Sequence, residues 1–372
     1  MKKKVAVFGC TGSIGTSTLN IIREFPDEFE VCALTAQSNK AKLEALAHEF
    51  HCRNTLLTAY AKPEQVDTLI AQSNADIAVN GVAGSAGLQF SHMILTHGID
   101  LALANKETIV MAAPQIKKLA QEHHCALLPV DSEHSAVFSM TERFGIENIH
   151  SAILTASGGP FRTLPAEQLQ TVTAADALKH PTWNMGHKIT IDSATLANKG
   201  LEVIEACALF DLSPEQVQVV IHPQSLIHSF VRTKDGVLYA QLSPPDMRHP
   251  ILTALTWPRM TASTLEQFDP AAGTPQDGIA LTFYPPRLND FPMLSLAYQA
   301  IRSKGSYTIA YNAANEAAAL AFLAGQIRFH EIAELTETVL SSDWQQTAVT
   351  ISDVLLLDKQ ARTQAQQFLN RR

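Results

Sequence analysis

Short apolar runs alternate with amphipathic stretches through the first third of the chain. One such stretch, 39–50, places Leu43, Leu46, Ala47 and Phe50 at the spacing of one helix face. Alternation of strands and helices is typical of a parallel, doubly wound α/β sheet, and we expect that fold here. The segments that we predict as strands are 4–8, 29–35, 55–58, 76–79, 100–104 and 126–130.

A second α/β region and a helical end follow. A strand is predicted at 151–156, before a Gly-Gly-Pro turn, and a helix over about 194–210. Between 269 and 292 the chain holds several proline and glycine residues, which indicates a linker. Further strands are predicted at 217–221, 229–232 and 237–241, and helices at 293–303, 311–324, about 330–339 and 351–370. We therefore expect a central α/β domain and a small C-terminal helical bundle.

Composition narrows the function classes. The 372 residues are 46% hydrophobic and 17% charged, which is typical of a globular protein with two or three domains. The net charge of −8 argues against a general attraction to nucleic acid or to an anionic membrane. An anionic substrate would have to be bound by local groups.

Cysteine usage and the N-terminus indicate the compartment. The five cysteines are odd in number and lack a C-x-x-C spacing, which favours free thiols and argues against a Cys-ligated zinc site. The apolar run after Lys4 is too short for a signal peptide, and no apolar stretch is long enough to span a bilayer. We expect a cytoplasmic protein.

A glycine-rich loop directly follows the first predicted strand. Gly9, Gly12 and Gly15 have the spacing G-x-x-G-x-x-G, not the G-x-G-x-x-G of the usual dinucleotide fingerprint. Between a strand and a helix, such glycines let the backbone approach a pyrophosphate at the helix N-terminus. We predict nucleotide binding in a Rossmann-like sheet; the alternative is a plain tight turn.

The end of the second predicted strand favours NADP over NAD. An NAD site usually has an acidic residue there for the ribose 2′-hydroxyl. This chain has Gln37, Ser38, Asn39 and Lys40 instead, which suit a 2′-phosphate. Ser38 is also a good cap for the following helix, and both roles are compatible.

Two polar clusters follow the fifth and sixth predicted strands, where open parallel sheets bind ligands. They are Asn105-Lys106-Glu107 and Asp131-Ser132-Glu133. In an extended chain residues two apart share a face, so Asp131 and Glu133 converge and suit Mg²⁺ or Mn²⁺. The alternative, that one of them caps a helix or pairs with a lysine, stays open from the local sequence.

Three further segments carry candidate chemistry. Asn198, Glu202 and Glu205 share one helix face beside Lys199, and their small and apolar neighbours favour a partly buried helix over a solvated ion pair. The turn 157–160 is either a phosphate cradle or a sharp bend. The segment 180–187, with a tryptophan and a methionine, suits a lid over a ligand; the alternative is a surface loop.

Taken together, these motifs resemble the 1-deoxy-D-xylulose 5-phosphate reductoisomerase family over nearly the whole chain. The motifs are Thr11-Gly12-Ser13-Ile14-Gly15, Leu103-Ala104-Asn105-Lys106-Glu107, Pro129-Val130-Asp131-Ser132-Glu133-His134, Ser157-Gly158-Gly159-Pro160-Phe161, the run 180–205, Ile221-His222-Pro223-Gln224-Ser225, Pro245-Asp246-Met247-Arg248 and Asn312-Ala313-Ala314-Asn315-Glu316. The chain departs from the common pattern at three places: Cys10 in the glycine loop, Gln37-Ser38 where Gly-Lys often stands, and His187 where an arginine is frequent.

The resemblance implies roles for individual residues. Asp131, Glu133 and Glu202 match the metal ligands, and with Lys106 they form the implied catalytic set. The implied substrate contacts are Lys106, Ser132, Glu133, Ser157, His180, Ser193, Asn198, Lys199 and Glu202, with Trp183 and Met185 as a hydrophobic cover. The implied cofactor contacts are Thr11, Gly12, Ser13, Ile14, Ser38, Asn39, Asn105, Glu107, Gly186 and Met247.

The resemblance also implies a reaction and an organisation. The expected activity is the rearrangement of 1-deoxy-D-xylulose 5-phosphate and its reduction by NADPH to 2-C-methyl-D-erythritol 4-phosphate, a step of isoprenoid precursor synthesis, with Mg²⁺ or Mn²⁺. We expect an NADPH-binding domain over 1–130, a catalytic domain that binds metal and substrate over 131–260, a linker over 261–290 and helices over 291–372, in a homodimer. The rivals are a sugar-phosphate dehydrogenase that performs no rearrangement and an NADPH-sensing regulator without turnover.

Overall fold

The computed structural model describes residues 1–183, 185–273 and 278–371. These residues form two compact units. Unit 1 comprises Met1–Thr108, Ala113–Ser135 and Asp246–Leu265, and unit 2 comprises Ile109–Ala112, Ala136–Pro245 and Glu266–Arg372. Among the described helices, none is long and apolar enough to cross a membrane.

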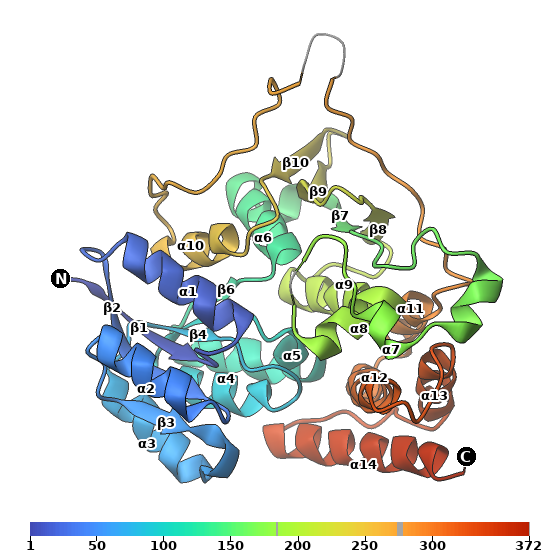
Figure 1. Cartoon of the computed structure of the whole chain (residues 1–372), viewed down its shortest axis with the longest axis horizontal. Coiled ribbons are helices and arrows are strands. Elements are labelled where there is room, and N and C mark those ends of the chain that lie inside the picture. Colours follow the sequence, from blue (N-terminus) through green and yellow to red (C-terminus); the bar gives the residue numbers. More distant parts are fainter. Residues whose placement is uncertain (184, 274–277, 372) are drawn as a thin grey trace. The chain divides into compact units, whose positions relative to one another are not determined.

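Unit 1 is built on a parallel six-stranded sheet with the order β3-β2-β1-β4-β5-β6 (Figure 1). Its strands are β1 Lys3–Phe8, β2 Phe29–Ala36, β3 Thr55–Leu57, β4 Ile77–Asn80, β5 Asp100–Leu103 and β6 Leu127–Pro129. The central strands are buried continuous runs, as parallel strands covered on both faces require. The order reverses between β1 and β4, and ligands bind at the carboxyl ends of such a switch point. This confirms the predicted doubly wound sheet.

Helices connect these strands and flank the sheet. They are α1 Ser13–Glu24, α2 Lys40–Glu49, α3 Pro63–Ser73, α4 Gly87–Thr96, the start of α5 Lys106–Glu122, the start of α6 Ser132–Phe144, and α10 Arg248–Thr256. The late helix α10 packs on α1 and on β5 and β6. A segment from the second half of the chain thereby completes the cover of the first sheet.

Unit 2 holds a mixed four-stranded sheet with the order β10-β9-β7-β8. Its strands are β7 Ile149–Ala156, β8 Val217–Ile221, β9 Ile227–Thr233 and β10 Leu238–Leu242. Strand β7 is parallel to β8 and antiparallel to β9. The helices α7 Ala174–Ala177, α8 His187–Thr195 and α9 Ala197–Leu209 lie between β7 and β8 in the chain.

The C-terminal part of unit 2 is helical, as predicted. Its helices are α11 Met293–Ser303, α12 Tyr307–Leu323, α13 Glu331–Leu340 and α14 Ile351–Leu369. The alanine-rich α12 is surrounded by its neighbours, packing on α11, α13 and α14 and also on α8 and α9. The helical end therefore packs against α8 and α9, which carry the candidate residues Ser193, Asn198, Lys199 and Glu202.

Two local predictions need correction. The helix predicted over about 194–210 is present as α9, but it begins only at Ala197, because Leu196 adopts a left-handed conformation with φ of 62° and ends the separate helix α8. Residues 131–133 are not extended, because α6 begins at Ser132. Hydrophobic spacing does not reveal either change of backbone direction.

Gly200 is required where α9 packs on α11 and α12. A Cβ at this position would lie 2.5 Å from Tyr311 Oη and 2.9 Å from Ala297 Cβ. Tyr311 is completely buried and donates a hydrogen bond to the Met293 carbonyl, so its ring has little freedom to move. The close approach of these helices therefore depends on a residue without a side chain.

Replacing Gly200 by alanine should lower the free energy of unfolding by about 1–2 kcal/mol, because the added methyl group overpacks a tight buried contact at a cost of about 2–3 kcal/mol. The accompanying gain in helix propensity, about 1 kcal/mol, is too small to offset this cost fully. Urea denaturation of wild type and variant measures the difference. Gly278→Ala is the control, because a Cβ there meets open space. Equal stability of Gly200→Ala and wild type would contradict the packing argument.

Candidate active site

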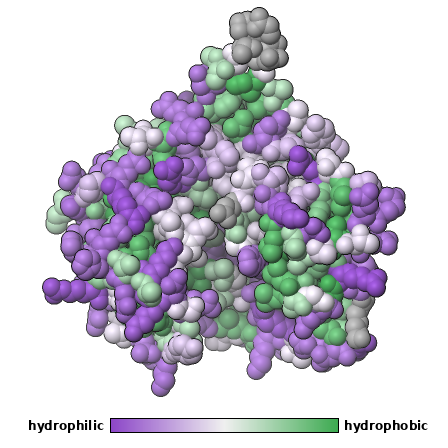
Figure 2. All heavy atoms as spheres, in the orientation of Figure 1, coloured by the Kyte–Doolittle hydropathy of each residue, from purple (hydrophilic) through white to green (hydrophobic). Residues whose placement is uncertain are grey.

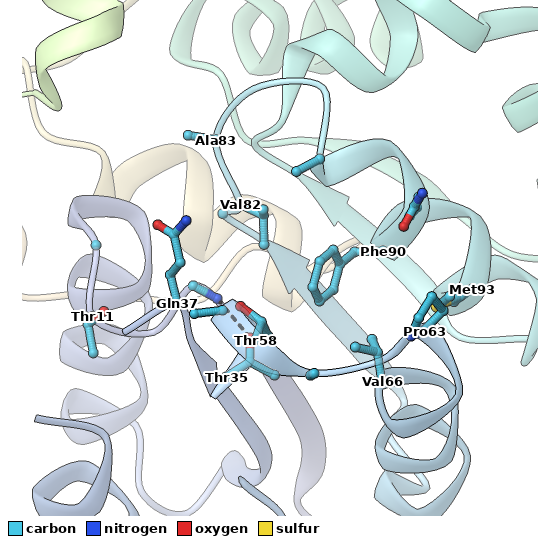
Figure 3. Close-up of a pocket in the computed structure, with 17 residues that line it drawn as sticks. Thr11, Thr35, Gln37, Thr58, Pro63, Val66, Val82, Ala83, Phe90 and Met93 are labelled. Atoms are coloured by element: carbon cyan, nitrogen blue, oxygen red, sulfur yellow. Dashed lines mark hydrogen bonds between the residues drawn. The ribbon is translucent and has the colours of Figure 1, made fainter. Parts of the chain in front are cut away.

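A cavity of about 480 Å³ lies in unit 1 at the carboxyl ends of the parallel strands (Figure 3). One side is formed by the glycine loop and the end of β2, and the other by the segment after β4 and by α4. The wall that faces the glycine loop is largely apolar, because Val66, Phe90 and Met93 point into the cavity there. The lining residues are Gly9, Thr11, Gly12, Thr35, Gln37, Thr58, Ala59, Ala61, Pro63, Val66, Gly81, Val82, Ala83, Ala86, Gln89, Phe90 and Met93.

The glycine loop has the close packing that the sequence predicted. Gly9 has a φ of 78°, and a Cβ there would lie 2.9 Å from the Gly81 carbonyl oxygen. A Cβ on Gly15 would lie 2.4 Å from the Gly9 carbonyl oxygen, so α1 approaches β1 as closely as backbone allows. Gly12 is the N-cap of α1 and lines the cavity. The exposed N-terminus of α1 thus lies at the cavity edge, where a diphosphate is favoured.

Neighbouring residues of this loop occupy different positions. Thr11 lines the cavity, whereas Ser13 is an exposed residue at the start of α1. Ile14 lies against Gly81, whose ideal Cβ would be 3.2 Å from Ile14 Cβ. Burial raises the pKa of the Cys10 thiol to about 11, so this departure from the family pattern adds no reactive thiolate.

The end of β2 presents neutral side chains to this region. Gln37 lines the cavity, and Ser38 and Asn39 are exposed. Asn39, not Ser38, caps α2 by accepting a 3.1 Å hydrogen bond from the Lys42 backbone N–H. The sequence had suggested Ser38 as the helix cap, but the cap is its neighbour Asn39.

Asn105 supports the cavity wall from behind. Its buried side-chain amide donates 2.8 Å hydrogen bonds to the carbonyls of Val82 and Gly84, in the segment that lines the cavity. The same amide contacts Glu107 Oε2 at 2.9 Å, and its oxygen accepts from the Thr108 backbone N–H. Asn105 and Glu107 thus hold the loop after β4 against the N-terminus of α5.

Lys106, Asp131 and His134 form a buried charged cluster in unit 1. Lys106 Nζ donates to Asp131 Oδ2 at 2.8 Å, and His134 Nδ1 lies 3.0 Å from Asp131 Oδ1. The Glu133 backbone N–H donates to Asp131 Oδ1 at 3.2 Å, and Ser132 Oγ donates to Glu133 Oε2 at 2.5 Å. Asp131 therefore both pairs with a lysine and caps α6, and it keeps the carboxylate oxygens that a hard cation prefers.

In unit 2 the predicted residues Ser157, His180 and Ser193 meet. His180 Nε2 lies 3.1 Å from the Ser157 hydroxyl and 3.1 Å from the Ser193 hydroxyl. Gly159 makes this possible, because its φ of 68° turns the chain and a Cβ there would lie 2.7 Å from the Ser193 carbonyl oxygen. The turn after β7 is thereby packed against α8, and three polar groups converge.

The protonation of His180 follows from its partners. Its Nδ1 accepts hydrogen bonds from the backbone N–H groups of Thr182 and Trp183, at 3.1 and 2.9 Å. Nδ1 therefore carries no proton, and Nε2–H is the donor toward the two hydroxyls. Burial also lowers the pKa of His180, which favours the neutral ring.

The predicted lid, 180–187, is described except for Asn184, which lies outside the described residues. Trp183 and Met185 are half-buried. Gly186 is exposed and forms the N-cap of α8, and in unit 1 Met247 forms the N-cap of α10. Neither Gly186 nor Met247 lines the cavity of unit 1.

The face of α9 predicted to carry chemistry is largely buried, with Asn198 partly exposed at its start. Glu202 accepts hydrogen bonds from the Asn198 amide and the Lys199 ammonium. The side chains of Lys199 and Glu202 are only 3% and 1% exposed, and Glu205 is buried as well. The Lys199–Glu202 pair considered as a solvated alternative does form, but away from water.

Sequence reasoning missed the apolar side of the cavity. Phe90 and Met93 come from α4, where apolar spacing predicts core contacts, and Thr58 and Ala59 follow the short strand β3. It also missed Lys42, whose ammonium donates to the Thr11 carbonyl at 3.0 Å, and considered Lys40 instead. No sequence signal separates these residues from ordinary core or surface positions.

Family models match most of the chain. A model described as 1-deoxy-D-xylulose 5-phosphate reductoisomerase matches residues 5–67 and 52–113. Two models of C-terminal domains of the same reductoisomerase match residues 127–210 and 242–364.

Individual relatives carry the same description. The reductoisomerase of Treponema denticola is 47% identical over 97% of this chain and 96% of its own length. That of Chlorobium chlorochromatii is 43% identical over 99% of this chain and 100% of its own length. The reductoisomerase of Zymomonas mobilis in complex with NADPH is 36% identical, with a TM-score of 0.90, over 99% of both chains. A DOX-P reductoisomerase in complex with NADPH, fosmidomycin and magnesium has the same identity and TM-score over 99% of this chain and 98% of its own.

The lowered pKa of His180 has a testable consequence. Between the folded pKa and the unfolded pKa, which is near 6.5, the unfolded chain binds more protons than the folded chain. The contribution of His180 to stability is therefore complete above about pH 6.5 and is lost as the pH falls through the folded pKa. The stability difference between wild type and His180→Asn should accordingly shrink from pH 7.5 towards pH 5.

Asparagine retains an acceptor for the two backbone N–H groups and does not titrate, so the comparison isolates the imidazole. Urea denaturation at each pH gives the difference, and NMR titration of the ring gives the pKa directly. His123→Asn, at an exposed position, serves as the control. An imidazole pKa above 6.5, or a difference that grows on acidification, would contradict the neutral Nε2–H assignment.

Proposed function

The chain belongs to the 1-deoxy-D-xylulose 5-phosphate reductoisomerase family, and on that premise we propose that it converts 1-deoxy-D-xylulose 5-phosphate into 2-C-methyl-D-erythritol 4-phosphate. It uses NADPH and a divalent metal ion, as its structural relatives do in their complexes with NADPH and magnesium. The observation that carries this proposal is the full-length match to these relatives. The cavity and charged clusters described above agree with it.

The cavity of unit 1 fits the adenosine half of NADPH. The apolar wall with Phe90 and Met93 suits an adenine ring, and the N-terminus of α1 suits the diphosphate. When bound, NADPH supplies the hydride that reduces the aldehyde formed by the rearrangement. We assign the cofactor contacts to Thr11, Gly12, Ser13, Ile14, Ser38, Asn39, Asn105, Glu107, Gly186 and Met247.

Asp131, Glu133 and Glu202 are the proposed metal ligands. They offer only oxygen donors, which is the set that Mg²⁺ prefers, and Mn²⁺ accepts the same ligands. The ion supplies Lewis acidity to neighbouring substrate oxygens when bound. In this structure lysines offset the charge of two of these carboxylates, since Lys106 pairs with Asp131 and Lys199 with Glu202.

The remaining polar groups suit an anionic sugar phosphate. Ser157, Ser193, Asn198 and Lys199 are proposed to bind the phosphate, and His180 orients the two serine hydroxyls through its Nε2. A lysine ammonium is a strong donor to phosphate oxygens. Lys106, with Ser132 beside it, is proposed to stabilise negative charge on the reacting oxygens. Trp183 and Met185 form the proposed hydrophobic cover.

Successive parts of the chain are proposed to have different functions. We propose that residues 1–130 bind NADPH, that 131–260 bind metal and substrate, and that 261–290 link these to the helices of 291–372. The five cysteines are free thiols, which supports a cytoplasmic enzyme.

We also propose a homodimer formed through the edge of the four-stranded sheet. Edge strand β8 is bridged by Tyr284, whereas among the described residues β10 pairs only with β9. Val237, Leu238 and Leu242, in and beside β10, are each more than one-third exposed. Ile279 and Phe283, later in the chain, are also exposed, and Figure 2 shows apolar surface in the upper part of the view. An unpaired apolar edge is a template for strand pairing, and the same edge on a second copy satisfies it symmetrically.

The direct test of the function is NADPH oxidation with 1-deoxy-D-xylulose 5-phosphate, with product analysis. Turnover should require Mg²⁺ or Mn²⁺ and stop in excess chelator. Glu202→Gln should lower kcat/KM roughly a hundredfold or more, because losing a ligand removes about 3 kcal/mol of transition-state stabilisation. Glu337→Gln, on the exposed face of α13, should leave turnover unchanged.

Because Glu202 is buried, the melting temperature of Glu202→Gln must be measured alongside its rate. Full activity in chelator would refute the metal requirement. NADPH oxidation that yields an unrearranged sugar alcohol would show a simple dehydrogenase instead.

The dimer proposal predicts that a Leu238→Lys, Leu242→Lys double variant is monomeric, because two charges are placed on the pairing edge. Light scattering coupled to size-exclusion chromatography gives the mass of each species. Leu356→Lys, at a residue 52% exposed on α14, should leave the mass unchanged. A wild-type monomer, or a double variant that remains dimeric, would exclude this interface.

A further inference from the structure

Lys42 connects α2 to the glycine loop. Its ammonium donates hydrogen bonds to the Thr11 carbonyl oxygen at 3.0 Å and to Thr16 Oγ1 at 3.3 Å. Both acceptors belong to the loop and first turn that precede and open α1. The side chain is exposed, so its charge is held at a fixed point on the surface and not sealed inside the unit.

The charge of Lys42 is not offset by a carboxylate among the described residues. Its neighbour Lys40 differs, because Lys40 is highly exposed and lies 3.6 Å from Glu44. An ammonium has three N–H donors, and Lys42 uses two of them on Thr11 and Thr16. One donor and the full positive charge therefore remain available to a ligand.

The Lys42 ammonium lies beside the glycine loop, near the place where the adenosine ribose of a dinucleotide is expected. Thr11 and Gln37 both line the cavity, and they come from the glycine loop and from the end of β2. In doubly wound sheets the adenosine ribose lies between these two segments, with its 2′ position toward the end of β2. Lys42 is anchored to Thr11 on that side of the loop, and residues 36–40 contain no carboxylate that would repel a phosphate.

We infer that Lys42 supplies the positive charge that recognises the ribose 2′-phosphate of NADPH. This inference rests on the proposed use of NADPH and assigns its selectivity over NADH to one residue. Ser38 and Asn39 contribute neutral donors beside it. Lys42 takes the part that the sequence had suggested for Lys40, because α2 directs position 42, and not position 40, toward α1.

The plain alternative is that Lys42 only ties α2 to α1. A structural tether would affect every adenine nucleotide equally, whereas a phosphate-binding charge affects only ligands with a 2′-phosphate. Binding is therefore measured by calorimetry on the full chain with four probes: NADPH, NADH, adenosine 2′,5′-bisphosphate and 5′-AMP. These measurements do not depend on turnover.

Lys42→Met keeps most of the side-chain stem and removes the charge. It should weaken NADPH and adenosine 2′,5′-bisphosphate about tenfold to a hundredfold, since hydrogen bonds between charged groups are strong. NADH and 5′-AMP should bind as to wild type. Lys42→Arg should retain most of the preference, and the matched control Lys40→Met should retain all of it. The NADPH affinity of wild type should also fall more steeply with salt than that of Lys42→Met.

The possible results distinguish the role of Lys42 from the cofactor preference of the protein. Equal weakening of all four probes by Lys42→Met would overturn the inference in favour of a tether, and so would unchanged binding of NADPH. Wild-type protein that binds NADPH no better than NADH would instead refute the proposed cofactor preference itself.

Discussion

The hydrogen bonds of Asn105 hold together the parts of unit 1 on which its chemistry depends. The buried amide fixes the Val82–Gly84 backbone, which forms one wall of the cavity, and its oxygen caps α5 through Thr108. The next residue, Lys106, holds Asp131. One helix N-terminus therefore sets the position of both the cavity wall and the acidic cluster. A shift of α5 would displace both.

The lysine–carboxylate pairs of the candidate site lower the stability of the fold or leave it unchanged. Removing a carboxylate and an ammonium from water costs several kcal/mol for each ion, and their attraction often only balances that cost. Yet unit 2 contains such a pair in Lys199–Glu202, and unit 1 contains a partly buried one in Lys106–Asp131. Apolar residues of similar volume would give an equal or more stable fold. The proposed binding of metal and substrate gives these charges a role that the stability of the fold does not require.

Much of the fold was predictable from the sequence, because buried parallel strands are short apolar runs with clear polar ends. The predicted strands agree with the observed ones to within about two residues, and 293–303 was predicted with the observed bounds. What the pattern does not contain is backbone direction. The left-handed Leu196 ends α8, and α6 starts at Ser132, just after the predicted strand, and neither change alters the spacing of the apolar residues. The convergence of Ser157, His180 and Ser193 was implied by the family motifs and not by spacing. Phe90 and Met93 were missed because an apolar side chain facing a cavity has the same spacing as one facing the core.

The cavity also separates affinity from selectivity. In the proposed complex its apolar wall would contact the adenine ring, which NADH and NADPH share, so those contacts would raise the affinity for both cofactors equally. Selectivity is a difference between two binding free energies, and only groups near the 2′ position contribute to it. Residues 36–40 contain no acidic residue that would favour NADH. The hydrogen-bond donors there are the neutral side chains of Gln37, Ser38 and Asn39 and the ammonium of Lys40. A lysine tied to the glycine loop has lost much of its side-chain freedom before a ligand arrives, so less entropy is lost on binding than for a mobile surface lysine. If Lys42 binds the 2′-phosphate as proposed, one charge held in place by the glycine loop would let this chain select NADPH without an arginine in that segment.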